Sequence, residues 1–199
     1  MMDRNLGATS ASASEVGSIG LLYQWGRKDP FLSSSSVDSA VQALSTGSWA
    51  TDDATMTADN TTKNPMTFYL GWENYLPDSS WSKDKTKYDP CPAGWRVPDG
   101  GSEGIWAKAA GGKTTVNVTT AKNYGKLFGD DDYIWYPCIG DLRPSDGKLD
   151  SHGYYWSVTT PSDDEAYYAY YCDFRWYYNF AAQTLHRSRG MSVRCQKIQ

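Results

Sequence analysis

The segment Tyr88–Pro98 constrains the fold more than any other part of the chain. It contains Pro90, Pro92 and Pro98, with Cys91 between the first two. Each proline fixes its own φ and removes a backbone N–H donor, and it also disfavours helical geometry in the residue before it. No helix can run through this segment. The sequence therefore predicts a shaped turn here, with a cysteine as a covalent anchor.

The chain has four cysteines, and their spacing favours disulfides over metal binding. No Cys-x-x-Cys pair is present and only two histidines occur, so the usual zinc and thioredoxin spacings are absent. Four cysteines allow three connectivities. Chain position favours Cys91 with Cys195, a bridge that would stabilise the fold by about 4 to 5 kcal/mol. Adjacent strands would then bring Cys138 to Cys172. Two or more buried, reduced thiols are the alternative.

Length and composition predict one globular domain. The 199 residues are 40% hydrophobic and 15% aromatic, which is enough to build a core. The formal net charge of −4 gives no basic surface for nucleic acid or anionic lipid. No run approaches the roughly 18 apolar residues of a membrane span. We expect a single monomeric domain over residues 1–199, with a polar loop insertion around residues 31–87.

The apolar pattern predicts short strands separated by turns. The predicted strands are Ile19–Trp25, Met66–Leu70, Tyr133–Ile139, Tyr154–Val158, Ala166–Trp176 and Gly190–Lys197. One short helix is expected over Glu103–Ala110, capped by Asp99 or Ser102 and ended by glycines. The predicted class is α+β, with mostly short antiparallel strands, one or two short helices and long loops.

Alternation along Ala166–Trp176 predicts which face of the longest strand is buried. The face of Cys172 is assigned to the core, and Asp173 and Arg175 are assigned to the outer face. A loop is expected after the strand. Five residues of this region are the predicted ligand-binding set: Asp173, Arg175, Tyr177, Tyr178 and Asn179.

Two alternatives stand beside this ligand-binding prediction. An ordinary amphipathic sheet surface would show the same alternation. The polar stretch of residues 33–64, which contains Trp49, is a second candidate surface, because loops can vary without disturbing a core.

Nothing in the sequence assembles a catalytic or metal site. His152 and His186 are the only histidines; His152 is interpreted as a surface residue of a turn, and the charges of Arg187 and Arg189 are expected to disfavour protonation of His186. Carboxylates cluster at Asp130–Asp132, but EF-hand spacing is missing and a solvated turn is the favoured interpretation. We expect no catalytic residue, no cofactor and no required metal.

Five motifs of the sequence stand out: Met2-Asp3-Arg4-Asn5-Leu6-Gly7-Ala8, Gly20-Leu21-Leu22-Tyr23-Gln24-Trp25-Gly26-Arg27-Lys28-Asp29-Pro30, Tyr88-Asp89-Pro90-Cys91-Pro92-Ala93-Gly94-Trp95-Arg96-Val97-Pro98, Gly153-Tyr154-Tyr155-Trp156-Ser157 and Arg189-Gly190-Met191-Ser192-Val193-Arg194-Cys195. Together they resemble the FISUMP-type major paralogous domains of bacterial surface lipoproteins. Their order and spacing cover nearly the whole chain. Their residue types, tryptophan, cysteine and glycine, are those that fill a core and allow tight turns.

The resemblance implies a C-type-lectin-like fold, related in architecture to formylglycine-generating enzymes and to bacterial adhesin tips. The sugar-binding and calcium-binding motifs of animal lectins are not found in this sequence. We expect a non-catalytic adhesion domain that binds a carbohydrate or an extracellular protein. Its expected place is the bacterial cell surface or outer membrane, as part of a larger exported protein. The alternatives are a structural tip or spacer subunit and, less favoured, a thiol oxidase that uses Cys138 and Cys172.

Overall fold

The computed structural model describes the chain in thirteen stretches. These are residues 1–13, 15–32, 48–50, 63, 65, 67–69, 80–110, 115–119, 124–128, 134–142, 152–161, 167–175 and 178–199. The regular elements are η1 (Val16–Ser18), β1 (Leu21–Gln24), β2 (Pro30–Leu32), β3 (Ser48–Ala50), β4 (Thr67–Tyr69), β5 (Trp95–Arg96), α2 (Ile105–Ala110), β6 (Thr115–Thr119), β7 (Tyr124–Phe128), β8 (Ile134–Pro137), β9 (Gly153–Trp156), β10 (Tyr168–Arg175), β11 (Tyr178–His186), β12 (Gly190–Ser192) and β13 (Gln196–Lys197).

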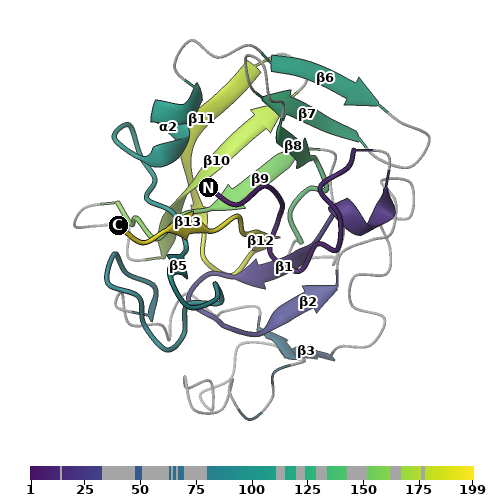
Figure 1. Cartoon of the computed structure of the whole chain (residues 1–199). Helices are drawn as coiled ribbons and strands as arrows, with labels where there is room; N and C mark the ends of the chain where they lie inside the picture. The colour runs from purple at the N-terminus through teal and green to yellow at the C-terminus, as the bar shows by residue number, and fades with distance from the viewer. Residues whose placement is uncertain are drawn as a thin grey trace.

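A six-stranded sheet forms the centre of the molecule (Figure 1), in the order β11-β10-β9-β12-β1-β2. Its pairs are antiparallel except for β12 with β9, which run parallel. Three smaller sheets pair β13 with β5, β3 with β4, and β6 with β7 and β8. The structure confirms the prediction of a fold made mostly of short strands with very little helix.

Several elements differ from those predicted. The helix begins at Ile105 rather than at Glu103, and the last predicted strand is divided into β12 and β13. The strands β6, β7 and β11 were not predicted. In β11, polar, alanine and aromatic residues follow one another without an apolar alternation, so the local sequence carries little strand signal. Pairing with β10 at seven positions makes this segment a strand although its own sequence gives little strand signal.

Three buried tryptophans, Trp25, Trp81 and Trp156, each donate a hydrogen bond from the ring nitrogen to a backbone carbonyl. Trp25 donates to the carbonyl of Ser157 at 2.8 Å, and Trp156 donates to the carbonyl of Tyr23 at 2.9 Å. Trp81 packs against Trp25 and donates to the carbonyl of Tyr88. A buried indole N–H without a partner would be destabilising, so these bonds let large rings fill the interior without that penalty.

The N-terminal segment is part of the core. The amide of Met2 donates to the carbonyl of Cys195, and the amide of Leu6 donates to the carbonyl of Val193. Asn5 is buried, and its Oδ1 accepts from Nε and Nη2 of Arg194 at 3.1 and 2.9 Å. Its Nδ2 donates to the hydroxyl of Tyr155. These contacts hold the two ends of the chain on the same side of the molecule (Figure 1).

None of the helices in the described part of the chain is long and apolar enough to cross a membrane.

Candidate functional site

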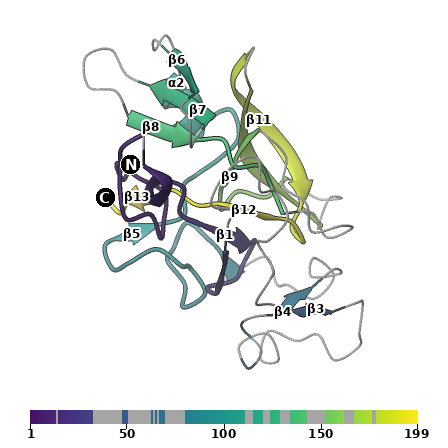
Figure 2. The same cartoon turned by 90° about the vertical axis from the view of Figure 1, so that its right-hand side faces the viewer.

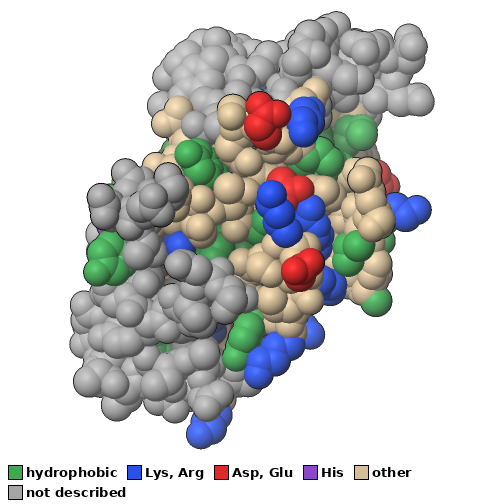
Figure 3. All heavy atoms as spheres, turned by 90° about the vertical axis from the view of Figure 1, so that its left-hand side faces the viewer, with side chains coloured by type: hydrophobic (Ala, Val, Ile, Leu, Met, Phe, Trp, Pro, Cys, Tyr) green, Lys and Arg blue, Asp and Glu red, His purple; other side chains and the backbone are tan. Residues whose placement is uncertain are grey.

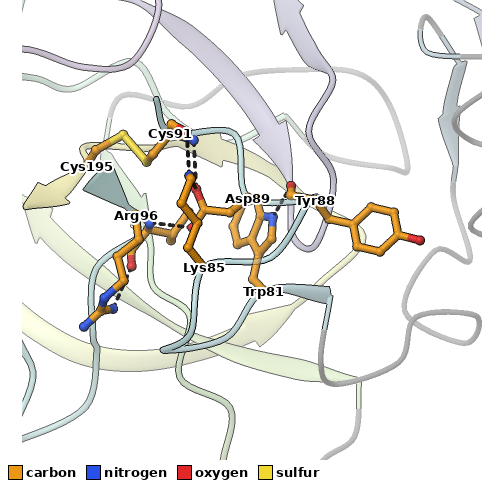
Figure 4. Close-up of a disulfide and its surroundings, with 8 residues drawn as sticks. Trp81, Lys85, Tyr88, Asp89, Cys91, Arg96 and Cys195 are labelled. Carbon is orange, nitrogen blue, oxygen red and sulfur yellow. Dashed lines mark hydrogen bonds and ion pairs between the residues drawn. A yellow bond between two sulfur atoms is a disulfide. The ribbon is translucent and has the colours of Figure 1, made fainter. Parts of the chain in front are cut away.

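The predicted bridge between Cys91 and Cys195 is present, with an S–S distance of 2.07 Å across 104 residues of sequence. The carboxylate of Asp89 lies beside it and is fully buried (Figure 4). Its Oδ1 accepts from Nζ of Lys85 and from the amide of Cys91, both at 2.8 Å. Its Oδ2 accepts from the amide of Val97 at 3.0 Å. We call Lys85, Asp89, Cys91, Val97 and Cys195 the cystine corner.

The backbone around the cystine corner follows the predicted turn. The amide of Trp95 donates to the carbonyl of Pro92, and Gly94 has a φ of 80°. Glycine adopts this left-handed conformation without the strain that a Cβ would cause. The turn aims the amides of Cys91 and Val97 at a single carboxylate. The cystine corner is therefore a structural clamp built from backbone and side-chain groups.

The second predicted disulfide is wrong: Cys138 and Cys172 are buried thiols that are not bonded to each other. Both lie in one aromatic cluster with Trp106, Tyr136 and Tyr155, and we call these five residues the thiol pocket. Rings fill the space around the sulfurs, with centroid distances of 5.5 to 5.7 Å among the three aromatic residues. The prediction noted that adjacent strands bring the cysteines together, but it did not account for these rings.

The thiol pocket does not favour nucleophilic sulfur chemistry. Burial raises the pKa of the Cys172 thiol well above its usual value, and the negative charge of Asp173 and the neighbouring Cys138 raise it further. Burial also raises the pKa of Tyr136, although the nearby Arg194 guanidinium opposes that shift. A thiolate is the nucleophilic form of cysteine, and it forms readily where positive charge or exposure stabilises it. Cys172 is instead buried and lies beside the negative charge of Asp173, so its surroundings disfavour the thiolate.

The structure corrects the predicted exposure of Asp173, because this residue is fully buried. The error lies in the assumption that one face of β10 meets solvent. The face of Cys172 belongs to the thiol pocket. On the opposite face, Ala169 and Tyr171 pack in the core with Trp25 and Trp156. Because both faces of this strand are covered, alternation along the sequence does not separate core from solvent.

Three of the other four predicted ligand-binding residues, Arg175, Tyr178 and Asn179, lie where β10 ends and β11 begins. Arg175 is the last residue of β10 and pairs with Tyr178, the first residue of β11. Tyr178 and Asn179 therefore belong to a strand, and their placement in a loop was wrong. Tyr177 lies outside the described residues, as do Asp130–Asp132 and most of residues 33–64. Trp49 belongs to β3, but its side chain is outside the description.

A different group of rings, partly accessible to solvent, lies at the opposite end of the same hairpin. Tyr168 and His186 are cross-strand partners with ring centroids 4.3 Å apart and an interplanar angle of 39°. The next pair on that face, Tyr170 and Thr184, is half-buried. We call Tyr168, Tyr170, Thr184 and His186 the Tyr168 patch. Tyr167, which is 48% exposed, lies in the turn just before β10 and outside the patch.

Hydrogen bonds from buried residues hold the backbone of the Tyr168 patch in place. Nε of Arg187 donates to the carbonyl of Tyr168 at 3.0 Å, and the amide of Arg187 donates to the carbonyl of Tyr167 at 2.9 Å. The Arg187 guanidinium is buried 4.3 Å from the ring centroid of Trp25. On the other side, the hydroxyl of Ser157 donates to the carbonyl of Tyr170. The strand ends beneath the patch are therefore fixed to the core.

The two histidines lie in separate ring contacts, one with Tyr154 and the other with Tyr168. Nδ1 of His152 lies 3.0 Å from the hydroxyl of Tyr154, while the exposed His186 stacks on Tyr168. In the described part of the chain, no group of three His, Cys, Asp or Glu side chains is placed to hold a metal ion. Figure 3 shows Lys and Arg side chains interspersed with Asp and Glu on one face of the molecule. Among the described residues, ion pairs join Arg4 to Asp3 and Arg96 to Asp99.

Sequence reasoning missed the Tyr168 patch for an identifiable reason. Tyr168 and Tyr170 were assigned to the buried face because they share it with Cys172. That face is covered beside Cys172, where α2 packs, and becomes accessible two to four residues earlier along β10. His186 was considered only as a proton-transfer residue. Recognising Tyr168 and His186 as a pair required the register of β11, which no local pattern supplied.

Comparisons of the chain with protein-family models, with curated proteins and with solved structures find no match in any of the three.

Proposed function

We propose that this chain is a non-catalytic recognition domain of the bacterial cell surface, and that it binds a carbohydrate or an extracellular protein through the Tyr168 patch. The observation that carries this proposal is the ring contact between the half-buried Tyr168 and the exposed His186, whose centroids lie 4.3 Å apart on the central sheet. Aromatic rings with polar edges suit stacking on a sugar ring or anchoring a protein partner. A fixed surface also loses less conformational freedom when a ligand binds.

The surface location is supported by the cystine corner. A disulfide across 104 residues is typical of proteins that fold in an oxidising compartment. Paired chain ends and irregular segments around a central sheet are compatible with the C-type-lectin-like fold that the motif resemblance implies. We therefore propose that fold as the finer description of the β-rich architecture. A spacer or tip subunit of a surface appendage is the alternative, and it requires no ligand at the Tyr168 patch.

A thiol-oxidase function receives no support from the thiol pocket. Such a reaction needs a reachable thiolate, whereas Cys172 is buried and its pKa is raised.

Binding to a glycan array and to immobilised matrix proteins tests the proposed function. The oxidised wild-type chain is compared with a Tyr168→Ala, His186→Ala double variant. Loss of the stacked pair should weaken binding by about tenfold or more, which corresponds to about 1.4 kcal/mol. Tyr167→Ala is the matched control, because it removes an exposed tyrosine that lies next to the Tyr168 patch but does not belong to it. Equal losses in both variants would contradict the assignment, and no binding by wild type would favour the spacer role.

A further inference from the structure

The loop that leads into α2, residues 99–104, borders the Tyr168 patch, and we call it the Gly100 loop. The amide of Gly100 donates to Oγ1 of Thr159 at 2.9 Å, and the amide of Tyr170 donates to the carbonyl of the same threonine at 2.9 Å. A Cβ at Gly100 would lie 3.1 Å from Cβ of Tyr170 and 2.2 Å from Oγ of Ser157. A residue without a side chain allows this close approach. The backbone of the loop therefore lies directly beside a ring residue of the patch.

The Gly100 loop is compact, so its tip stays close to the patch. The amide of Gly104 donates to the carbonyl of Gly101 at 3.1 Å, and a Cβ at Gly104 would lie 2.6 Å from Cα of Gly100. Ser102 and Glu103 form the tip between these contacts, and both are exposed. The loop thus brings an exposed hydroxyl and an exposed carboxylate to the border of the Tyr168 patch.

The base of the Gly100 loop is fixed, and its two carboxylates differ in their partners. Asp99 accepts from Nη1 and Nη2 of Arg96 at 3.0 and 2.6 Å, and its amide donates to Oε1 of Gln196 at 3.2 Å. The helix α2 follows the loop and contacts β11, beside which Figure 1 shows it. In the part of the chain that the structure describes, the carboxylate of Glu103 takes part in no ion pair. It can therefore accept hydrogen bonds from a ligand.

The rings of the Tyr168 patch suit a small ligand better than a broad apolar one. Tyr168 and Tyr170 are half-buried, and His186 is exposed. The large hydrophobic side chains that are exposed among the described residues are Tyr167 and Ile198. A protein partner is usually held by aromatic anchors that become buried in an apolar interface core. A sugar ring needs only part of one or two aromatic rings, together with polar groups that fix its hydroxyls.

We propose that the ligand of this surface is an uncharged carbohydrate. Its ring packs on the Tyr168 patch, and its hydroxyl groups donate to the carboxylate of Glu103 and exchange hydrogen bonds with Ser102. This inference rests on the proposed recognition function, and it adds the ligand class and the Gly100 loop. A carboxylate accepts strong, charge-assisted hydrogen bonds from hydroxyl groups. An acidic sugar would instead bring a like charge toward Glu103, on a chain whose net charge is already −4.

An array of uncharged, sialylated and sulfated glycans, with matrix proteins on the same support, tests this inference. The oxidised wild-type chain should bind uncharged glycans. Glu103→Gln should weaken that binding about three- to tenfold, because an amide oxygen accepts a weaker hydrogen bond than a carboxylate. Glu15→Gln is the matched control, because it makes the same charge change at another exposed glutamate. Figure 2 shows the N-terminal segment, in purple, on the other side of the molecule from the β10–β11 hairpin.

Reversing the charge at the tip of the Gly100 loop tests the ligand class more sharply. Glu103→Lys should weaken binding to uncharged glycans and should raise binding to sialylated or sulfated glycans about twofold or more at low ionic strength. Added salt should abolish the gain, because charges at an exposed site are screened. Circular dichroism of each variant checks that the fold is native.

The outcomes separate this inference from the recognition function. If the wild type binds neither a glycan nor a protein, the recognition function fails and the inference fails with it. If glycan binding requires Tyr168 and His186 but Glu103→Gln behaves like Glu15→Gln, only the role of the Gly100 loop is overturned. A wild type that prefers acidic glycans, or a matrix protein over all glycans, would overturn the inference and leave the recognition function standing.

Discussion

The two cysteine pairs of this chain lie in surroundings of opposite character. The cystine corner joins distant parts of the chain and is lined by backbone amides, a carboxylate and the ammonium of Lys85. The thiol pocket is lined by aromatic rings, and its two sulfurs remain thiols. The first pair stabilises the fold by a covalent constraint and directed hydrogen bonds, and the second acts as small apolar filling. The role of each cysteine pair therefore depends on the groups around it, which are polar in the cystine corner and aromatic in the thiol pocket.

The largest effect is expected from removing the disulfide. A Cys91→Ala, Cys195→Ala double variant should lose about 4 to 5 kcal/mol of unfolding free energy, because a loop of roughly 100 residues is no longer constrained in the unfolded chain. Urea denaturation followed by tryptophan fluorescence measures this loss. Reduction of the wild-type protein should reproduce it. A loss below about 1 kcal/mol would show that the corner contributes little beyond its hydrogen bonds.

Removing the buried carboxylate should have the next largest effect. Asp89→Ala leaves the amides of Cys91 and Val97 without their acceptor and separates Lys85 from its ion-pair partner, so we expect a loss of about 3 kcal/mol. The same denaturation assay measures it. Asp89→Asn should recover part of the loss, because an amide oxygen still accepts. Full stability of the alanine variant would contradict the role assigned to this carboxylate.

A polar substitution in the thiol pocket should lower the stability of the fold, and the two thiols should react slowly in the native protein. Cys172→Ser replaces a thiol by a more strongly hydrated hydroxyl in an aromatic environment, and about 1 to 3 kcal/mol should be lost. In the unreduced wild-type chain, iodoacetamide should modify two cysteines after denaturation, and neither should react quickly in the native state. Mass spectrometry distinguishes the cases. Rapid native modification at neutral pH would contradict the burial and the raised pKa of Cys172.

The smallest effect should come from a partly exposed ion pair near the cystine corner. Burial alone would raise the pKa of Asp99, but the hydrogen bonds and positive charge of Arg96 outweigh it, and the net pKa is lowered. The folded state therefore binds this proton less readily than the unfolded state. Its stabilising contribution is present above the unfolded pKa of about 3.9 and is lost as pH falls through the folded pKa.

The variant Asp99→Asn should accordingly cost at most about 1 kcal/mol at pH 7, and its stability should approach that of wild type in acid. Urea midpoints between neutral and acidic pH measure the convergence. Parallel curves for the two proteins over the whole range would show that Asp99 does not contribute through its charge.

Much of the β-rich character could be predicted because local chemistry determines it, whereas the Cys91–Cys195 bridge was favoured by the positions of its cysteines in the chain. The prolines around Cys91 exclude a helix, and the position of Cys195 near the chain end made the long bridge the first choice. The candidate site was harder to predict. Asp173 was assigned to solvent because alternation is informative only when one face of a strand is exposed. The structure covers both faces of β10 at that position.

By itself, the sequence determined the short strands, the turn at residues 88–98 and the presence of enough aromatic side chains for a core. These follow from backbone sterics and side-chain hydrophobicity, which act over a few residues. Only the tertiary structure decided that Cys138 and Cys172 remain thiols, that Tyr168 stacks on His186, and that β11 forms an edge. Each of these depends on the register and packing of segments that are distant in the chain, and no local pattern encodes those.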